Sequence, residues 1–548
     1  MAIVTSNTSQ TCGADDGRRG ASLSSAAGRW SWIWLLVGTA LLPFANLQTL
    51  IPLTAWLAPV FLMRFTRSQR LLVGLPVLVL AISGALFIGG RDGFFPVGDG
   101  PGYYLFIVTL GFGGALPFAV DRLLSPRLNG IARTVAFPVA VTTIEFLGTI
   151  GNPFGTAGSA AYSQYGSLSL LQLASVTGIW GLTFLISWLA PVLNQFWERG
   201  RSGPVVMAPA VLFVGAITAA VLFGGARLAF AAPEAETVRV AALAPDRALS
   251  ELAYSAPDLT SGRQAERDLA RSKYFTPVLD DLFERSEREA RAGAKIIAWS
   301  EAAARTLQED QAKVVARAAD LARRHQVYMQ VSMIVQLPAG SEARGGPRNE
   351  NHAVLLGPNG SIVWDYQKLK PTPGDGQHPA VGEVPTVDTP YGRIATIICQ
   401  DDFFPGLVRQ AGAAGTDILL IPSSDWDSVA AWHAQQAPFR AVENGVAVVR
   451  PTRQGISMAT DGQGRLLGHK ADYFVSDDQT MVVSVPTQGN GTGYVALGDA
   501  FAYLSAAGLL VLTGVAFRPK RRQQEPGTKT PMSGHPAETP DLLPGSPR

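Results

Sequence analysis

The chain has 548 residues, of which 47% are apolar and only 16% charged, against roughly 25% charged in ordinary soluble proteins. Its length suits two or three domains. The net charge is +2, and the polar part of the chain lacks a basic stripe interleaved with aromatic side chains, which argues against nucleic acid as a partner.

Apolar residues gather in eight segments that are long enough, or nearly so, to cross a bilayer as helices, which takes about 20 residues. The segments are 30–45, 47–63, 71–90, 103–120, 131–150, 168–196, 204–226 and 494–517. The first two could instead form one re-entrant hairpin. We therefore predict a membrane domain of about seven helices over 30–226, a last transmembrane helix over 494–517, and disordered cytoplasmic tails at 1–29 and 518–548.

Positive charge marks every second end of these spans. The basic positions are Arg18, Arg19 and Arg29, then Arg64, Arg67 and Arg70, then Arg122, Arg127 and Arg133, then Arg199 and Arg201, and finally Arg518, Lys520, Arg521 and Arg522. Basic loops stay in the cytoplasm, so seven spans would carry residues 237–488 to the outside. The expected protein is a multi-pass membrane protein with an extracytoplasmic domain.

One carboxylate, Glu145, lies inside the fifth predicted span. An intramembrane carboxylate is costly and often functional, but it can also be protonated or hydrogen-bonded to a neighbouring helix. The sequence leaves both interpretations open.

Residues 237–488 alternate between short β-rich runs and helical stretches, which predicts an α/β domain. Strands are expected at 238–245, 295–301, 327–336, 393–400, 417–424 and 445–451, hairpins at 351–368 and 455–486, and helices at 264–293, 308–325, 405–415 and 428–445.

Three potentially reactive side chains, Glu301, Lys368 and Cys399, come at or just after the ends of these strands. Ligands of α/β sheets bind beyond the carboxyl ends of strands, where side chains distant in sequence converge. A lone cysteine is most often a small buried hydrophobe, and a strand-end Glu or Lys is usually solvated. Together, however, a thiol, a base and a cation are what a cysteine nucleophile requires.

Cysteine and histidine usage bears on redox and metal chemistry. Cys12 and Cys399 lie in different regions, so a structural disulfide is not expected. The six histidines show no paired ligand spacing and no CxxC motif occurs, so we expect neither a metal nor another cofactor.

The motifs around these residues, IIAWSE, YQK and ATIICQDDFFPGLVR, resemble the Glu–Lys–Cys series of the nitrilase, or carbon–nitrogen hydrolase, superfamily. The stretch GTDILLIPSSDW extends the match. The apolar part, with GNPF, AYSQYG and TGIWGLTFL, is similar to the apolipoprotein N-acyltransferase family, and the resemblance covers roughly 30–517.

This resemblance implies an αββα sandwich beside a polytopic helical membrane domain. It implies Glu301 as general base, Lys368 as the cation that stabilises an oxyanion, and Cys399 as nucleophile, with Lys370 the competitor for the lysine role. The residues expected to support the site, by oxyanion stabilisation or from the surrounding shell, are Gln400, Asp401 and Asp425, although Asp425 could equally cap a turn.

The sequence departs from the family pattern at several positions. Ser300 stands where a proline is usual, Gln400-Asp401 replace Tyr-Glu, and Gly376 takes the place of a further functional Glu. Asp375 or Glu383 could substitute for that Glu. In addition, Gly148 stands where an Arg commonly follows the intramembrane Glu145.

The resemblance predicts transfer of an acyl chain from a phospholipid, through a cysteine thioester, to the N-terminal amine of a lipoprotein whose cysteine already carries diacylglycerol. A membrane-tethered amidase or nitrilase would use the same three residues but pass the acyl group to water. A relative whose site has decayed is the third possibility.

Overall fold

The structure is a computed structural model that describes residues 30–518, apart from 97–99, 201–202, 231–235, 257–262, 339, 342–344, 470–472 and 477. The tail predicted at 1–29, with Cys12, and nearly all of the tail predicted at 518–548 lie outside the described residues.

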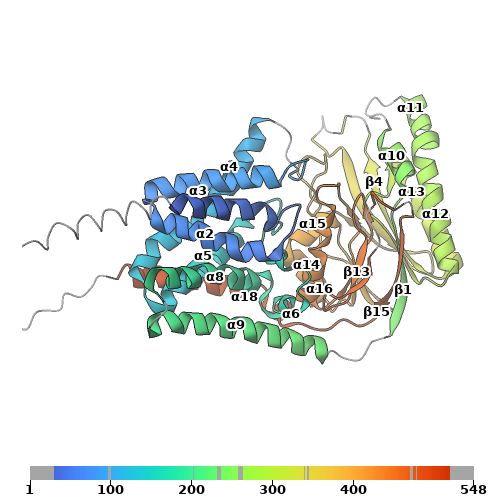
Figure 1. The fold of residues 1–548 in the computed structure, drawn as a ribbon. Coiled ribbons are helices and arrows are strands. Elements are labelled where there is room, and N and C mark those ends of the chain that lie inside the picture. Colours follow the sequence, from blue (N-terminus) through green and yellow to red (C-terminus); the bar gives the residue numbers. More distant parts are fainter. Residues whose placement is uncertain are drawn as a thin grey trace, which may run out of the picture.

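The first part of the chain is a bundle of apolar helices, with the α/β domain at one end of it (Figure 1). Its helices are Trp30–Phe44, α2 (Pro52–Ser68), α3 (Leu71–Gly89), α4 (Pro101–Leu124), α5 (Gly130–Gly148), α6 (Leu168–Leu171), α7 (Ala174–Thr177), α8 (Ile179–Arg199) and α9 (Pro204–Ala229). Among the described residues, α3, α4 with its following turn, α5, α8 and α9 are long and apolar enough to cross a membrane. Their outer faces carry exposed side chains such as Leu72, Leu105 and Leu222. The protein is therefore a membrane protein, because lipid is the solvent that suits such a surface.

The helix α18 (Ala500–Ala516) joins this bundle from the far end of the chain and packs against α5. A short helix, α17 (Gly493–Leu497), precedes it. The predicted span 494–517 is thus divided at Gly498, which has φ 55°.

The predicted span 168–196 is not one continuous helix. It breaks at Gly178, whose φ of 62° is accessible to glycine but strained for other residues. The Tyr494 ring also lies 2.6 Å from where a Cβ of residue 178 would be, so this position has no room for a side chain. The break separates α6 and α7 from the membrane-spanning α8.

The intramembrane carboxylate Glu145 is hydrogen-bonded inside the bundle. It accepts from Ser159 Oγ and Thr183 Oγ1, both at 2.9 Å, and from the backbone N–H of Ala160 at 3.2 Å. Of the two interpretations that the sequence left open, these contacts favour the structural one.

The rest of the described chain forms two large sheets packed face to face and a small two-stranded sheet. The strands are β1 (Thr237–Leu243), β2 (Ile296–Trp299), β3 (Ala304–Leu307), β4 (Tyr328–Gln336), β5 (Asn349–Leu356), β6 (Ile362–Gln367), β7 (Thr386–Thr389), β8 (Gly392–Thr396), β9 (Ile418–Leu420), β10 (Ser423–Ser424), β11 (Ala447–Arg450), β12 (Thr452–Arg453), β13 (Met458–Thr460), β14 (Leu466–His469) and β15 (Thr480–Pro486). One sheet has the order β15-β1-β2-β4-β5-β6, with β3 beside β4. The other has the order β14-β13-β11-β9-β8-β7.

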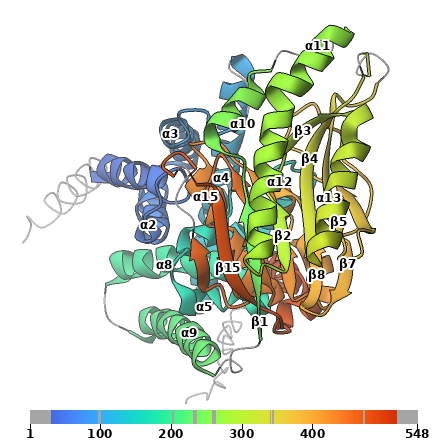
Figure 2. The same cartoon turned by 90° about the vertical axis from the view of Figure 1, so that its right-hand side faces the viewer.

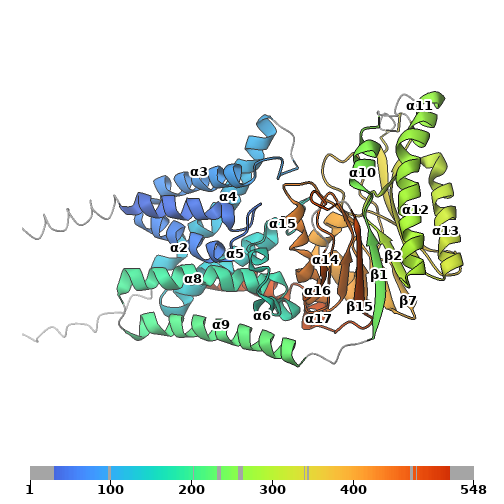
Figure 3. The ribbon, with the colours of Figure 1, turned by 45° about the vertical axis from the view of Figure 1, so that its right-hand side comes forward.

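Helices cover the outer face of each sheet. The helices of this domain are α10 (Arg247–Tyr254), α11 (Gln264–Leu269), α12 (Thr276–Arg291), α13 (Gln311–His325), α14 (Pro405–Ala413), α15 (Ala430–Ala434) and α16 (Ala437–Asn444). In Figure 2, α12 and α13 lie over the first sheet, and in Figure 3, α14 and α16 lie between the second sheet and the membrane helices. Apolar side chains from both sheets, among them Val240, Ile296, Ile394 and Val448, form the core between the layers. The domain is therefore the expected αββα sandwich.

The two parts of the molecule are joined by buried polar contacts. Arg440 and Glu443 on α16 form an ion pair with no exposed surface. Arg440 also donates to the hydroxyl of Tyr162, and Glu443 accepts from the backbone N–H of Ile179 at 3.0 Å. These residues therefore hold the α/β domain against the loops of the membrane part.

Candidate active site

Cys399 occupies a tight turn rather than the end of a strand. The strand β8 ends at Thr396, and Cys399 begins a 3₁₀ turn, Cys399–Phe403. Its φ is 48°, a left-handed conformation that costs a non-glycine residue energy and is often found at functional sites. The turn is held by a hydrogen bond from Cys399 N to Pro422 O at 2.9 Å, and the thiol lies 3.7 Å from Ser424 O. The strand predicted at 393–400 therefore ends four residues early, at Thr396, which is three residues before the cysteine.

Glu301 and Lys368 meet beside this turn in a buried ion pair. Lys368 Nζ lies 2.7 Å from Glu301 Oε1, and Asn351 Nδ2 donates to the same oxygen, also at 2.7 Å. Glu301 follows β2, Lys368 follows β6, and Asn351 lies on β5, so three strands of the same sheet supply the cluster. Ala302, directly after Glu301, also has a left-handed φ, 49°.

The charges around Cys399 determine how readily its thiol ionises. Burial raises the pKa of the thiol, and the negative charge of Glu301 raises it further, whereas the Lys368 ammonium lowers it. Burial also acts to lower the pKa of Lys368, but Glu301, Cys399 and Asp375 outweigh it and keep the ammonium charged. The thiol therefore rests protonated next to a carboxylate that could accept its proton.

Asp401 links the cysteine turn to the strand that carries Lys368. Its carboxylate accepts from Tyr366 Oη at 2.8 Å, from Ile398 N at 2.9 Å and from Lys370 N at 2.8 Å. Burial raises the pKa of Asp401 to about 6, although these hydrogen bonds oppose the rise. Lys370, the other candidate for the role of Lys368, has its ammonium over the Phe404 ring and not beside Glu301.

The side chain of Gln400 reaches the membrane part instead of the thiol. Its Nε2 donates to Pro153 O at 2.7 Å, and its Oε1 accepts from Thr372 Oγ1 at 2.9 Å. Two residues could take the place of the family's extra Glu: Asp375 lies close enough to Lys368 to raise its pKa, whereas Glu383 is exposed.

A buried network behind Cys399 contains a histidine that sequence reasoning did not single out. His433 on α15 contacts Asp425 Oδ1 through Nδ1 at 2.7 Å and Asp402 Oδ1 through Nε2 at 3.2 Å. Arg450 donates to both oxygens of Asp425 at 3.0 Å. Asp425 thus belongs to an ion network beside the site, and no sequence signal connects it to His433, eight residues later.

Both ring nitrogens of His433 face carboxylates, an arrangement that favours the doubly protonated imidazolium. Burial and Arg450 act to lower its pKa, but Asp425 and Asp402 outweigh them and the pKa is raised. Ligand atoms of Cys399, Asp425 and His433 lie within 4.8 Å of one another. Because Arg450 and His433 already engage Asp425, and carboxylates engage both ring nitrogens, this cluster fits an ion network better than a metal site.

Replacing His433 by Gln is expected to make the thiol of Cys399 less reactive. The substitution removes one positive charge and leaves Asp402, Asp425 and Arg450 with a net negative charge near the sulfur, which raises the thiol pKa. Alkylation by iodoacetamide at neutral pH should slow about tenfold, the factor given by ~1.4 kcal/mol of lost thiolate stabilisation, and its pH profile should move to higher pH. His325→Gln, in a contact with Glu287 far from the site, is the control. An unchanged profile in His433→Gln contradicts this prediction.

The fold and the cysteine site define a class of protein: a membrane protein in which a helical membrane domain carries an α/β enzyme domain. Residues 263–486 match the model of the carbon-nitrogen hydrolase family. Among solved structures, an amidase from Nesterenkonia sp. is similar at 19% identity, with a TM-score of 0.37, over 50% of this chain and 98% of that one.

Over most of its length the chain is similar to apolipoprotein N-acyltransferases. That of Geobacter metallireducens is 26% identical over 72% of this chain and 76% of its own length. Apolipoprotein N-acyltransferase 2 of Treponema pallidum is 27% identical over 64% and 70%, and that of Bradyrhizobium diazoefficiens is 25% identical over 76% and 78%. The resemblance predicted from the motifs is confirmed, and with it the prediction of an acyltransferase-type enzyme.

Proposed function

We propose that the protein transfers an acyl chain from a phospholipid to the N-terminal amine of a lipoprotein that carries diacylglycerol on its cysteine, through a thioester on Cys399. The observation that carries the proposal is the buried Glu301–Lys368 pair, 2.7 Å apart, next to a strained cysteine turn. The names of the relatives support both the reaction and the acceptor.

In the first half-reaction Glu301 takes the proton of Cys399, and the thiolate attacks the carbonyl carbon of the phospholipid ester. The oxyanion of the tetrahedral intermediate is stabilised by the Lys368 ammonium and the backbone N–H of Gln400. Removing one such donor typically costs ~3 kcal/mol. The intermediate collapses to the thioester, and the lysophospholipid alkoxide leaves with the proton from Glu301.

In the second half-reaction the neutral amine attacks the thioester carbonyl, and Glu301 accepts the proton that the nitrogen loses. Collapse of this intermediate forms the amide and expels the Cys399 thiolate, which recovers its proton from Glu301. Splitting the reaction in this way predicts ping-pong kinetics and an acyl-enzyme that can be isolated.

A line of aromatic rings supports access from the bilayer to the site. Phe403, four residues after Cys399, packs on Trp432 with ring centroids 5.6 Å apart, and Trp432 packs on Phe94 at 5.1 Å. Phe95 continues the line to Phe106 on α4 at 5.6 Å. An acyl chain following these rings would stay out of water, which is worth about 0.8 kcal/mol per CH₂.

The proposed site is on the outer face of the bacterial inner membrane. The described chain begins and ends at the end of the bundle remote from the α/β domain (Figure 1). The basic residues Arg67 and Arg133 both pair with Glu198 on α8. With the positive-inside rule, this arrangement supports a cytoplasmic position for that end of the bundle and an extracytoplasmic α/β domain.

The test is incubation of the purified protein with a phospholipid that carries a labelled acyl chain, followed by a diacylated lipopeptide with a free N-terminus. We expect label on Cys399 before the peptide is added and on the peptide amine afterwards. Label released as free fatty acid at the same rate with and without peptide would identify a hydrolase instead. An absence of label on both protein and peptide would identify a relative without activity.

A further inference from the structure

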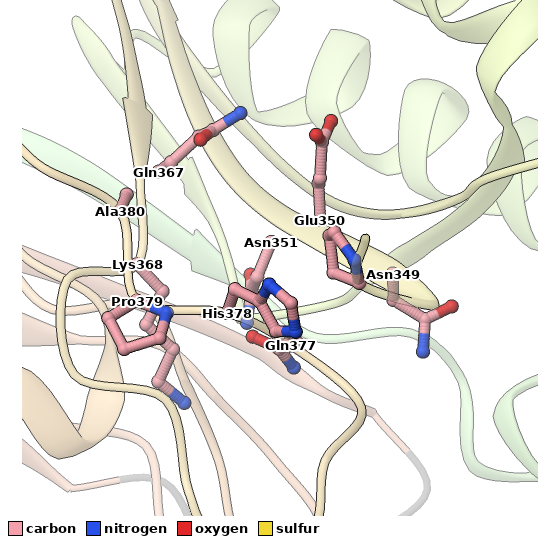
Figure 4. A pocket seen from close by; sticks show the side chains of 10 residues that line it. Asn349, Glu350, Asn351, Gln367, Lys368, Gln377, His378, Pro379 and Ala380 are labelled. Carbon is pink, nitrogen blue, oxygen red and sulfur yellow. The ribbon is translucent and has the colours of Figure 1, made fainter. Parts of the chain in front are cut away.

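A small polar cavity opens beside the Glu301–Lys368 pair. It has a volume of about 150 Å³ and is bordered by Lys368 and Asn351, which both bind Glu301, and by Asn349, Glu350, Gln377 and His378. Figure 4 shows the side chains of Asn351, Gln377 and His378 close together. The proposed mechanism places no part of a substrate in this space.

Its small size and its polar side chains favour a small polar group over an acyl chain. A cavity of 150 Å³ in another protein holds one benzene ring, so this one has room for a group of only a few heavy atoms. The side chains around it are largely polar, which makes it a poor place for hydrocarbon.

The cavity presents hydrogen-bond acceptors that lack donors. Among the described residues, no donor reaches Asn351 Oδ1 or Gln377 Oε1, although both atoms are buried. The orientation of the Asn351 amide is determined by its neighbour, because the Glu301 carboxylate only accepts and must face Nδ2. Oδ1 is therefore left as an acceptor, and an unpaired buried oxygen is costly until a donor binds it.

Charge favours a cationic donor over an anion. The Lys368 ammonium is already paired with Glu301, and in Figure 4 it points away from Glu350 and Asn349. In Figure 4 the carboxylate of Glu350 points away from Asn351 and Gln377, and on that side of β5 it contacts His352 Nε2 at 3.3 Å. The negative charge that lies near the ion pair is Asp375, which interacts with both Glu301 and Lys368. An alkylammonium has donors and no acceptor, so it matches these oxygens.

We propose that this cavity binds a primary ammonium group of a substrate before or during acyl transfer. The inference rests on the proposed function. That ammonium belongs either to the N-terminus of the acyl acceptor or to the ethanolamine headgroup of a donor phospholipid. For the acceptor, the ammonium held at Asn351 loses one proton to solvent before the neutral amine attacks the thioester, and Glu301, one hydrogen bond from Asn351, takes the second proton as the amide forms.

The test measures each half-reaction separately in the variant Gln377→Leu. This substitution removes one hydrogen-bond acceptor from the cavity and leaves Glu301, Lys368 and Cys399 in place. Three quantities are measured: loading of Cys399 from an ethanolamine phospholipid, loading from a glycerol phospholipid, and transfer from loaded enzyme to a lipopeptide amine. If the acceptor amine is the ligand, the half-saturating lipopeptide concentration should rise at least tenfold, a loss of about 1.4 kcal/mol, with both loading steps unchanged. If the headgroup is the ligand, only loading from the ethanolamine lipid should weaken.

Two further variants make the result decisive. Gln377→Glu adds a negative charge to the cavity and should lower the same half-saturating concentration that Gln377→Leu raises. Gln264→Leu, the same substitution on the exposed α11, should change nothing. The inference would be overturned if both Gln377 variants left all values unchanged, or if both lost equally in all three steps. In either case the proposed function would still stand as long as Cys399 of the wild type is loaded with label. Failure of the wild type to load would overturn both.

Discussion

Replacing Cys399 by alanine is expected to lower acyl transfer by roughly 10⁴-fold or more, because the covalent route then has no nucleophile. The fold should survive the change. The side chain is 5% exposed, alanine is smaller than cysteine, and the hydrogen bond from residue 399 N to Pro422 O does not involve the sulfur. The measurement is the rate of label transfer from phospholipid to lipopeptide, together with the thermal unfolding midpoint.

Two further cysteine variants serve as a comparison and a control for Cys399→Ala. Cys399→Ser should be nearly as inactive, because a hydroxyl ionises far less readily than a thiol and the site around it is built for a thiolate. Cys12→Ala should retain full activity. If Cys399→Ala kept more than about a tenth of the wild-type rate, another residue would have to be the nucleophile.

Breaking the buried Glu301–Lys368 pair from one side is expected to cost both activity and stability. The side chains are 6% and 3% exposed. Either Glu301→Gln or Lys368→Met leaves one charge buried without its partner, which typically costs ~3–5 kcal/mol. Each variant should also lose at least ~10²-fold in acyl transfer, because one lacks the base and the other lacks a donor to the oxyanion.

The double variant separates the two effects. With Glu301→Gln and Lys368→Met together no unpaired charge remains, so the unfolding midpoint should recover toward the wild type while activity stays lost. Lys313→Met, which removes an exposed contact to Asp310, is the control and should cost less than about 1 kcal/mol. Destabilisation by the double variant equal to the sum of the single ones would show that the pair does not interact.

The lysine variant also has a signature in pH dependence. The Lys368 ammonium lowers the pKa of the Cys399 thiol, so its removal leaves burial and Glu301 to raise that pKa. Alkylation of Cys399 in Lys368→Met should therefore require a higher pH than in the wild type, the same direction as for His433→Gln. The two cations come from different elements of the fold, because Lys368 follows β6 and His433 lies on α15.

Much of this architecture followed from patterns that are local in the chain. The apolar segments, the alternation of strands and helices in 237–488, and the placement of Glu301 and Lys368 after strands all depend on neighbours a few residues away, and periodicity reports such neighbours directly. The same holds for the sandwich as a class, because buried strands covered by amphipathic helices have few ways to pack.

What only the tertiary structure decided involves residues far apart in the chain. The break at Gly178 depends on Tyr494, the side chain of Gln400 is directed to Pro153, and His433 is brought to Asp402 by the packing of α15. A polar group can be buried where a hydrogen-bond partner lies next to it, and no local sequence pattern shows which distant residue supplies that partner. The sequence by itself therefore determined the layers of this protein and the three residues that we expect to react, whereas packing alone decided the ion network behind the thiol and the polar cavity beside the ion pair.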